Sequence, residues 1–437
     1  MMSIRALRLA ALCVALLHAG SAVAAEPIVL SLLTNRTGPS SAVGARVANG
    51  MRDYLEMLNQ RDGGIGGTRV QVEECEVASD LERGLACYEA ARKAGAVLVS
   101  PPDRALTRAL VEPSARDRIP LLSLADGFPI GTRGDVMPWV FNPSAWVLGG
   151  LTITVSYLAE KAGGLGELKD LSIGLAYSTG ADPAALATLR DLAARYGFAT
   201  PLFALEETER DDEVWERIGR QPPNHLILLG QGVQAGISVE RALKVGFPAD
   251  RLIALRWPDE AVLRKAGSAG RGFKEISRHA FGDAFPAFDE IDLHVVDRGL
   301  SRTPKTGSGE THYNRGIYNA VLLAEAIRNA QRRGAPGALK GEDLRRGLET
   351  LSIDDVRWKE LGLSGFARAV AFTCMDHGGH PPGFVQVWDG AKWLPAAGPI
   401  PQMSEAVDAR LDQVVAEFLG ANPGWPARAE PCDQPPT

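Results

Sequence analysis

The chain has 437 residues, of which 45% are hydrophobic, 23% charged and 6% aromatic, and its formal net charge is −6. This length predicts two or three domains with substantial cores, and the composition excludes collagen, coiled-coil and disordered classes. The negative charge argues against nucleic acid as a partner, because phosphate contacts need clustered lysine and arginine.

Residues 1–25, MMSIRALRLAALCVALLHAGSAVAA, have the three-part pattern of a secretory signal peptide. Arg5 and Arg8 precede an apolar stretch, and the small residues of Ala22-Val23-Ala24 predict cleavage near Ala24 or Ala25. We therefore expect an exported, periplasmic protein, and loss of the two arginines changes its net charge from −6 to −8. The alternative, a buried N-terminal helix, is disfavoured by the Ala-x-Ala ending.

The mature chain begins with short apolar runs that alternate with amphipathic helical patterns. The expected strands are 28–34, 69–75, 96–99 and 120–124, and the expected helices are 43–59, 80–94 and 104–116. Near-continuous apolar strands separated by such helices predict a parallel sheet covered on both faces.

The same pattern restarts after Phe141-Asn142-Pro143, where the proline interrupts it. Here the expected strands are 171–177, 201–205, 225–229 and 252–255, and the expected helices are 146–161, 183–196 and 233–245. The restart predicts two α/β lobes rather than one long sheet.

The remaining chain predicts further helices at 313–332, 341–348 and 405–419. Residues 369–373 and 384–388 are interpreted as paired strands, with Asp389-Gly390 as a turn. We expect residues 26–143 and about 280–350 in the first lobe, and 144–279 and about 351–400 in the second. Residues 401–437 are expected to form a C-terminal helix and a loose tail.

Export changes how the cysteines are interpreted. Cys13 lies in the leader, which leaves Cys75, Cys87, Cys374 and Cys432. Four cysteines in an oxidising compartment suggest two disulfides, in any of three pairings. A local bridge from Cys75, at the end of a strand, to Cys87, in the next helix, would leave Cys374 with Cys432; the alternative is four thiols.

Catalytic and metal motifs are weak. The glycines at 63–67 follow a helix and precede a strand, which is the reverse of a phosphate-binding loop and typical of a helix end. Cys374, His377 and His380 have a spacing that could supply zinc ligands, but an oxidised Cys374 could not serve as one. We expect no catalysis, no metal and no cofactor.

The polar residues concentrate where strands end. In open α/β sheets, ligands bind outside the carboxyl ends of the strands. Here the loops that follow the strands contain hydroxyls, amides, glycines, carboxylates and aromatic rings, the chemistry of a site for a small polar molecule.

An ordered series of segments resembles the substrate-binding proteins of branched-chain amino-acid type ABC transporters. They include TGPSSAVGARVANGMRDYLEMLN, DGGIGGTRVQV, ACYEAARKAGAVLVSPP, SARDRIPLLS, LSIGLAYSTGADP, LGQGVQAGISVERALKVGF and YNRGIYNAVLLAEAIRNA. The resemblance implies a type I periplasmic binding fold: two parallel-sheet α/β lobes joined by a three-segment hinge. It also implies a receptor that captures a small polar solute between closing lobes and delivers it to a membrane permease with ATPase subunits.

The resemblance places ligand contacts on both lobes. The expected ligand-binding residues are Ser100, Asp103, Arg104, Ser123, Ala125, Asp126, Trp146, Tyr177, Thr179, Gln231, Trp257 and Asp259. Asp103 and Asp126 depart from the hydroxyl or small residues that the family uses there. If both face the ligand, they favour an amine, amide or polyol over a simple amino acid; alternatively, Asp103 and Arg104 belong to the start of a helix.

Two other functions stay open at this point. A ligand sensor that presents its closed form to a receptor, without transport, would have the same fold. A secreted metal-dependent hydrolase built on the Cys374 loop is a third interpretation, which stoichiometric zinc would support.

Overall fold

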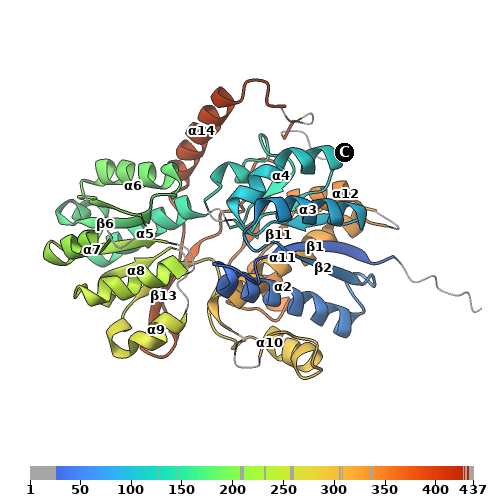
Figure 1. Cartoon of the computed structure of the whole chain (residues 1–437), viewed down its shortest axis with the longest axis horizontal. Coiled ribbons are helices and arrows are strands. Elements are labelled where there is room, and N and C mark those ends of the chain that lie inside the picture. Colours follow the sequence, from blue (N-terminus) through green and yellow to red (C-terminus); the bar gives the residue numbers. More distant parts are fainter. Residues whose placement is uncertain are drawn as a thin grey trace, which may run out of the picture.

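Two lobes lie side by side, each built around its own sheet (Figure 1). The computed structural model describes residues 26–125, 127–144, 146–206, 211–230, 233–255, 260–304, 307, 309–334, 338–426, 428 and 431–432. The expected signal peptide lies outside the described residues. Within those ranges, no helix combines the length and the apolar character that a membrane crossing requires.

The first lobe contains a five-stranded parallel sheet in the order β2-β1-β3-β4-β5. Its strands are β1 (Ile28–Thr34), β2 (Val70–Glu76), β3 (Leu98–Ser100), β4 (Leu121–Leu122) and β5 (Val140–Phe141). Its helices are α2 (Ser41–Asp62), α3 (Leu81–Lys93), α4 (Arg104–Asp117), α10 (Pro286–Ile291), α11 (Thr311–Arg332), α12 (Gly341–Glu349) and α13 (Asp355–Glu360). The apolar run of β1 is almost entirely buried, because helices cover both faces of the sheet.

The glycine-rich segment after α2 ends that helix, as expected. Gly63 has a left-handed φ of 71°, and its N–H donates to the carbonyl of Leu58. Glycine adopts this conformation without the steric cost that a side chain would bring, so the chain can turn back into β2.

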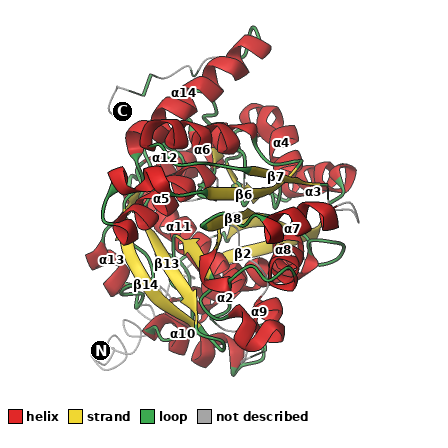
Figure 2. Ribbon diagram, turned by 90° about the vertical axis from the view of Figure 1, so that its left-hand side faces the viewer, coloured by secondary structure: helices red, strands yellow, loops and turns green. Residues whose placement is uncertain are grey.

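The second lobe contains a seven-stranded sheet in the order β14-β13-β10-β9-β8-β6-β7. Its strands are β6 (Ile173–Ser178), β7 (Leu202–Leu205), β8 (His225–Leu229), β9 (Leu252–Ala254), β10 (Lys274–Ser277), β13 (Gly383–Trp388) and β14 (Trp393–Ile400). Its helices are α5 (Val147–Ala162), α6 (Pro183–Tyr196), α7 (Asp211–Arg220), α8 (Val233–Lys244) and α9 (Glu260–Ala266). Strands β6 to β10 are parallel, and the β13–β14 hairpin adds two antiparallel strands at one edge (Figure 2).

The predicted pairing of 369–373 with 384–388 is wrong. Residues 370–371 form β12 (Val370–Ala371), which pairs with β11 (Ser352–Ile353), whereas β13 pairs with β10 and β14. The Asp389-Gly390 turn is real, but it joins β13 to β14. Alternation alone identified these strands without identifying their partners.

The expected lobe boundary after residue 350 also needs correction. Leu351, Trp358, Phe366 and Phe372 are buried in the same core as Leu30 and Tyr54, so residues up to 372 pack in the first lobe. The chain then returns to the second lobe with the β13–β14 hairpin. The final helix, α14 (Ser404–Ala421), contacts both lobes.

Both expected disulfides are present, and their pairing is the one that follows from a local bridge between Cys75 and Cys87. Cys75 is bonded to Cys87, with Cα atoms 5.7 Å apart, and Cys374 to Cys432, with Cα atoms 5.3 Å apart. Cys374 is therefore no thiolate ligand, and no group of metal-ligating side chains occurs among the described residues.

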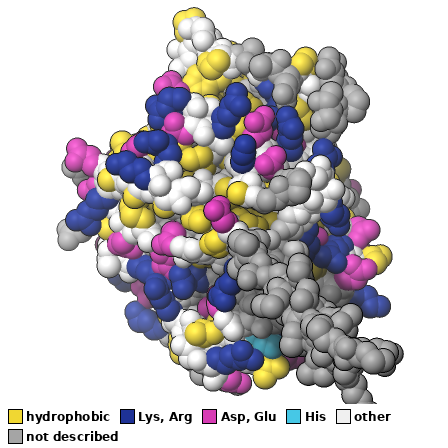
Figure 3. Space-filling model, turned by 90° about the vertical axis from the view of Figure 1, so that its right-hand side faces the viewer, with side chains coloured by type: hydrophobic (Ala, Val, Ile, Leu, Met, Phe, Trp, Pro, Cys, Tyr) yellow, Lys and Arg dark blue, Asp and Glu magenta, His cyan; other side chains and the backbone are white. Residues whose placement is uncertain are grey.

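The outer face of the first lobe carries basic and acidic side chains intermingled with apolar ones (Figure 3). This mixture is the ordinary surface of an acidic protein with a net charge of −6.

Candidate ligand-binding site

The carboxyl ends of the two sheets face each other across the lobes. Arg104 follows β3 in the first lobe, and its Nη2 donates to the carbonyl of Gly180, just after β6 in the second lobe, at 3.2 Å. The loop after β3 therefore meets the loop after β6 between the lobes, and we call the surface formed by the described carboxyl ends of the strands on both sides the interlobe face. This is where open α/β sheets bind ligands.

Two buried serines end the central strands of the first lobe. Ser123 is satisfied internally: its Oγ lies 2.8 Å from Oγ1 of Thr107 and accepts from the N–H of Ala125 at 3.1 Å. Ser100 is also fully buried, but its Oγ has no hydrogen-bond partner. A buried hydroxyl without a partner costs free energy unless a bound molecule supplies one.

Asp103 caps helix α4. Its Oδ1 accepts from the N–H of Leu106 at 2.9 Å, which satisfies one of the open N–H groups of the first turn. The carboxylate that looked out of place in the sequence therefore has a structural task. This supports the interpretation that Asp103 and Arg104 form a helix start.

Replacing Asp103 by alanine is expected to lower the free energy of unfolding by about 1 kcal/mol, because the cap is lost. Asp103→Asn keeps an acceptor and is expected to stay within a few tenths of the unmodified protein. Urea unfolding without solute measures both variants, and Asp80→Ala is a matched control, since Asp80 caps α3 by the same contact to Arg83. The capping role would be contradicted if Asp103→Ala, Asp103→Asn and Asp80→Ala had the same free energy of unfolding as the unmodified protein.

The second lobe contributes a half-buried Tyr177 and an exposed Thr179 at the end of β6. The N–H of Thr179 donates to the carbonyl of Leu205 at 3.0 Å, which ties this loop to β7. A small cavity of about 10 Å³ lies beside it, lined by Ser178, Leu229 and Arg241 among others. It has room for about one water molecule and not for a solute.

A buried aromatic and cationic cluster lies behind the interlobe face, where the chain crosses between lobes. The guanidinium of Arg278, just after β10, lies 5.2 Å from the ring centre of Trp146, at the start of α5. The Tyr318 hydroxyl, on α11, is buried without a hydrogen-bond partner. Burial lowers the pKa of the adjacent His279 to about 3, so its ring is neutral.

A second contact joins the lobes at α9. Oε1 of Glu260 accepts from the N–H and the hydroxyl of Thr311, at 3.1 and 3.0 Å. Arg264 pairs with Glu310 at 3.1 Å, and Glu310 also pairs with Arg46 of α2 at 2.8 Å. Together with the Arg104 contact, this holds the two lobes against each other at separate places.

One acidic group near this face lies where burial disfavours its negative charge. Glu275, in β10, is fully buried, and both its carboxyl oxygens lack a hydrogen-bond partner. Burial raises the pKa of Glu275 well above its usual value, and the nearby Glu260 acts in the same direction. Burial therefore favours the protonated form of its carboxyl group.

A model of the periplasmic binding protein family matches residues 27–392 of the chain. The chain belongs to this family. A solved structure from the Pseudomonas fluorescens group, described as an ABC transporter permease, is 30% identical, with a TM-score of 0.85, and the match covers 93% of this chain and 100% of that one. No curated protein matches the chain significantly.

More distant solved structures share the fold alone. A branched-chain amino acid ABC transporter protein from Thermus thermophilus with bound valine is 16% identical, with a TM-score of 0.71, covering 90% of this chain and 99% of that one. A fatty acid ABC transporter substrate-binding protein from Thermomonospora curvata is also 16% identical, with a TM-score of 0.65, covering 88% and 94%. The present chain is thus a periplasmic binding protein, and its fold does not fix the solute.

The structure describes only some of the expected site residues of this binding protein. Asp126, Gln231, Trp257 and Asp259 lie outside the described residues, so their roles stay predictions. Trp146 is only 4% exposed, and Arg278 covers its ring. Ser100, Ser123, Ala125, Tyr177 and Thr179 follow or end strands on the interlobe face, and Arg104 bridges the lobes.

Sequence reasoning missed Arg278 and Tyr318. Arg278 follows β10, a strand that we did not predict because Lys274 and Glu275 interrupt its apolar pattern. Tyr318 lies in the middle of a correctly predicted helix, where an aromatic residue indicates a core position. No sequence signal brings these two residues to Trp146.

Proposed function

We propose that this protein is the solute-binding receptor of an ABC importer. It captures a small polar solute, an amino acid or a related amide, amine or aromatic acid, between its two lobes. Lobe closure is a hinge motion driven by contacts that the solute makes with both lobes, and the closed form docks on a membrane permease with ATPase subunits. Binding and release require no catalytic step.

The buried and unpartnered hydroxyl of Ser100, at the carboxyl end of β3, is the observation that carries the proposal. It belongs to the sheet edge that Arg104 connects to the facing edge of the second lobe. A solute held there would contact both lobes and so favour closure. Export, inferred from the leader sequence, would put the protein where it meets such solutes.

The acidic residues no longer favour one solute class. Asp103 is engaged in a helix cap, Glu260 accepts from Thr311, and burial favours the protonated form of Glu275. The described carboxylates therefore give little support to a cationic solute, and amino acids remain among the candidate solutes.

Thermal unfolding of the mature protein tests the proposal against a panel of amino acids, amides, polyamines and aromatic acids. A solute present at 100 times its Kd and bound only to the folded state is expected to add about 2.7 kcal/mol of stability. A group of chemically related hits would support a receptor, and no hit from any class would count against it. Uptake by cells with and without the protein then separates transport from a purely sensory role.

Replacing Ser100 by alanine is expected to weaken binding of the identified solute about tenfold, the worth of one lost hydrogen bond. Ser114→Ala is the matched control, because Ser114 is a fully buried hydroxyl of the same lobe that donates to the Val111 carbonyl. Isothermal titration measures both variants. Equal loss in the two would mean that Ser100 acts through stability and not through contact with the solute.

A further inference from the structure

Helix α14 packs on both lobes at once. It starts at Ser404, directly after the β13–β14 hairpin of the second lobe, and it lies along one side of the molecule between the lobes (Figure 1). Its first half buries Val407 and Leu411 against Leu148 of α5 and Ala184 of α6. Its second half packs Val415 and Phe418 against the core of the first lobe.

Charged contacts of α14 divide in the same way. Arg410 pairs with Asp191 on α6 of the second lobe. Two residues later, Asp412 pairs at 2.6 Å with Arg133 of the first lobe. Opposite sides of one helical turn are therefore bound to different lobes.

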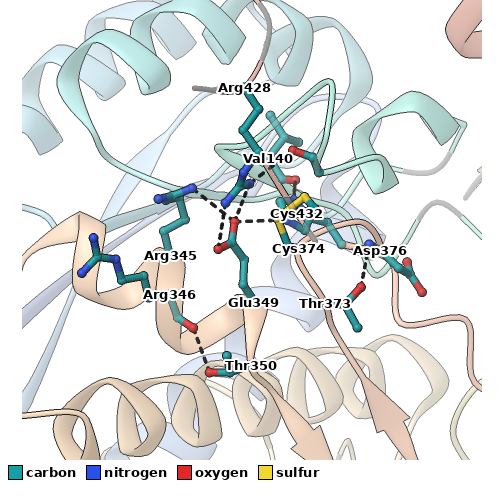
Figure 4. A network of polar contacts seen from close by, with 12 residues as sticks. Val140, Arg345, Arg346, Glu349, Thr350, Thr373, Cys374, Asp376, Arg428 and Cys432 are labelled. Atoms are coloured by element: carbon teal, nitrogen blue, oxygen red, sulfur yellow. Dashed lines mark hydrogen bonds and ion pairs between the residues drawn. A yellow bond between two sulfur atoms is a disulfide. The ribbon is translucent and has the colours of Figure 1, made fainter. Parts of the chain in front are cut away.

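The described residues of the tail after α14 are bound on the side of the first lobe. The indole N–H of Trp425 donates to the carbonyl of Val136 at 2.9 Å. Arg428 makes a bidentate contact with Glu349 of α12, at 2.7 and 3.1 Å (Figure 4). Cys432 is bonded to Cys374, at the start of the crossover to the second lobe. This part of the crossover is held to the first lobe, because the N–H of Gly134 donates to the carbonyl of Met375 at 3.0 Å and the N–H of His377 donates to the carbonyl of Thr132 at 2.7 Å.

We propose that α14 and its tail form a strap that limits how far the lobes separate, and that the Cys374–Cys432 disulfide locks this strap to the first lobe. The strap is a fourth connection between the lobes, after the crossovers near 142–146, 277–282 and 373–382. Opening the hinge must pull α14 away from one of its two apolar contacts. The disulfide prevents the tail from detaching from the first lobe in place of this separation. This goes beyond solute binding, because it sets the range of the motion and not the identity of the solute.

The proposal is tested without any solute. The strap variant combines Cys374→Ser, Cys432→Ser, Trp425→Ala and Arg428→Ala, which remove the contacts of the tail with Cys374, Val136 and Glu349 without replacing any residue of α14. The control variant, Cys75→Ser with Cys87→Ser, removes the other disulfide, which joins the end of β2 to α3 within the first lobe. Small-angle X-ray scattering of the mature, solute-free proteins measures the radius of gyration, and amide hydrogen exchange follows α14.

We expect the strap variant to have a larger radius of gyration than the unmodified protein and about tenfold faster exchange in α14. The control is expected to keep both values. Faster exchange in α14 with an unchanged radius of gyration would overturn the proposal, because the strap would then be released without any effect on the lobes. If the strap variant does not fold, the same measurements on the control variant, which keeps the Cys374–Cys432 disulfide and lacks the other, before and after reduction by dithiothreitol decide between these outcomes.

Discussion

Replacing Glu349 by glutamine is expected to destabilise the protein by about 3 to 5 kcal/mol at neutral pH, the cost of breaking a buried ion pair from one side. The carboxylate lies at the end of α12 and accepts both contacts from Arg428. Arg345 approaches it at 3.3 Å, and Nε2 of His377 lies 3.5 Å away (Figure 4). The side chains of Arg345 and Arg428 are only 6% and 8% exposed, so removal of the negative charge leaves two poorly hydrated guanidinium groups together.

The same group predicts an acid-sensitive step in stability. Burial alone would raise the pKa of Glu349, but His377, Arg428 and Arg345 outweigh it and lower this pKa to about 2. A carboxyl whose folded-state pKa is depressed stabilises the protein above its unfolded-state pKa, and this contribution is lost as the pH falls through the folded-state value. Between pH 4.5 and pH 2 the unmodified protein is therefore expected to lose about 3 kcal/mol that Glu349→Gln does not lose.

Urea unfolding across this pH range gives the measurement. Glu325→Gln is the matched control: Glu325 is also buried in the first lobe, and it accepts two contacts of 2.9 Å from Arg357, but it does not touch the tail. Both variants are expected to be destabilised, whereas faster hydrogen exchange at Trp425 and Arg428 is expected only for Glu349→Gln. Parallel acid profiles for the unmodified protein and Glu349→Gln would refute the assignment of this step to Glu349.

Local patterns were sufficient for most elements of the fold. Runs such as 28–34 and 225–229 are apolar enough to be buried strands and too short to be buried helices, and the helices between them carry clear amphipathic faces. Glycine after a helix, as at Gly63, marks the helix end, because its left-handed conformation is intrinsic to the residue. These are short-range properties, which the sequence displays directly.

Tertiary partners were not predictable in this way. The amphipathic face of α14 indicates burial but does not indicate that one half packs on each lobe. The cluster of Trp146, Arg278 and Tyr318 joins residues that are distant in sequence. In the candidate site, strand ends located Ser100 and Ser123, whereas the capping role of Asp103 required the geometry of the first turn of α4.

Gly316→Ala is expected to destabilise the protein by about 2 to 3 kcal/mol, although alanine is the better helix former. Gly316 lies at the crossing of α11 with α2, where an added Cβ would collide with the carbonyl of Val47 and come within 2.8 Å of the backbone nitrogen of Met51. Both are backbone atoms of α2, which cannot rotate away as a side chain would. The two helices would have to separate, and the apolar contacts along their length would loosen.

Gly420→Ala provides the control with the opposite sign. Gly420 lies in the last turn of α14, and nothing lies within 4 Å of the position its Cβ would take. Alanine there is expected to raise the free energy of unfolding by up to about 1 kcal/mol, because it removes glycine's freedom in the unfolded chain without a collision. Urea unfolding of both variants decides the matter: a stabilised Gly316→Ala would mean that helix propensity outweighs the close approach of α2 and α11.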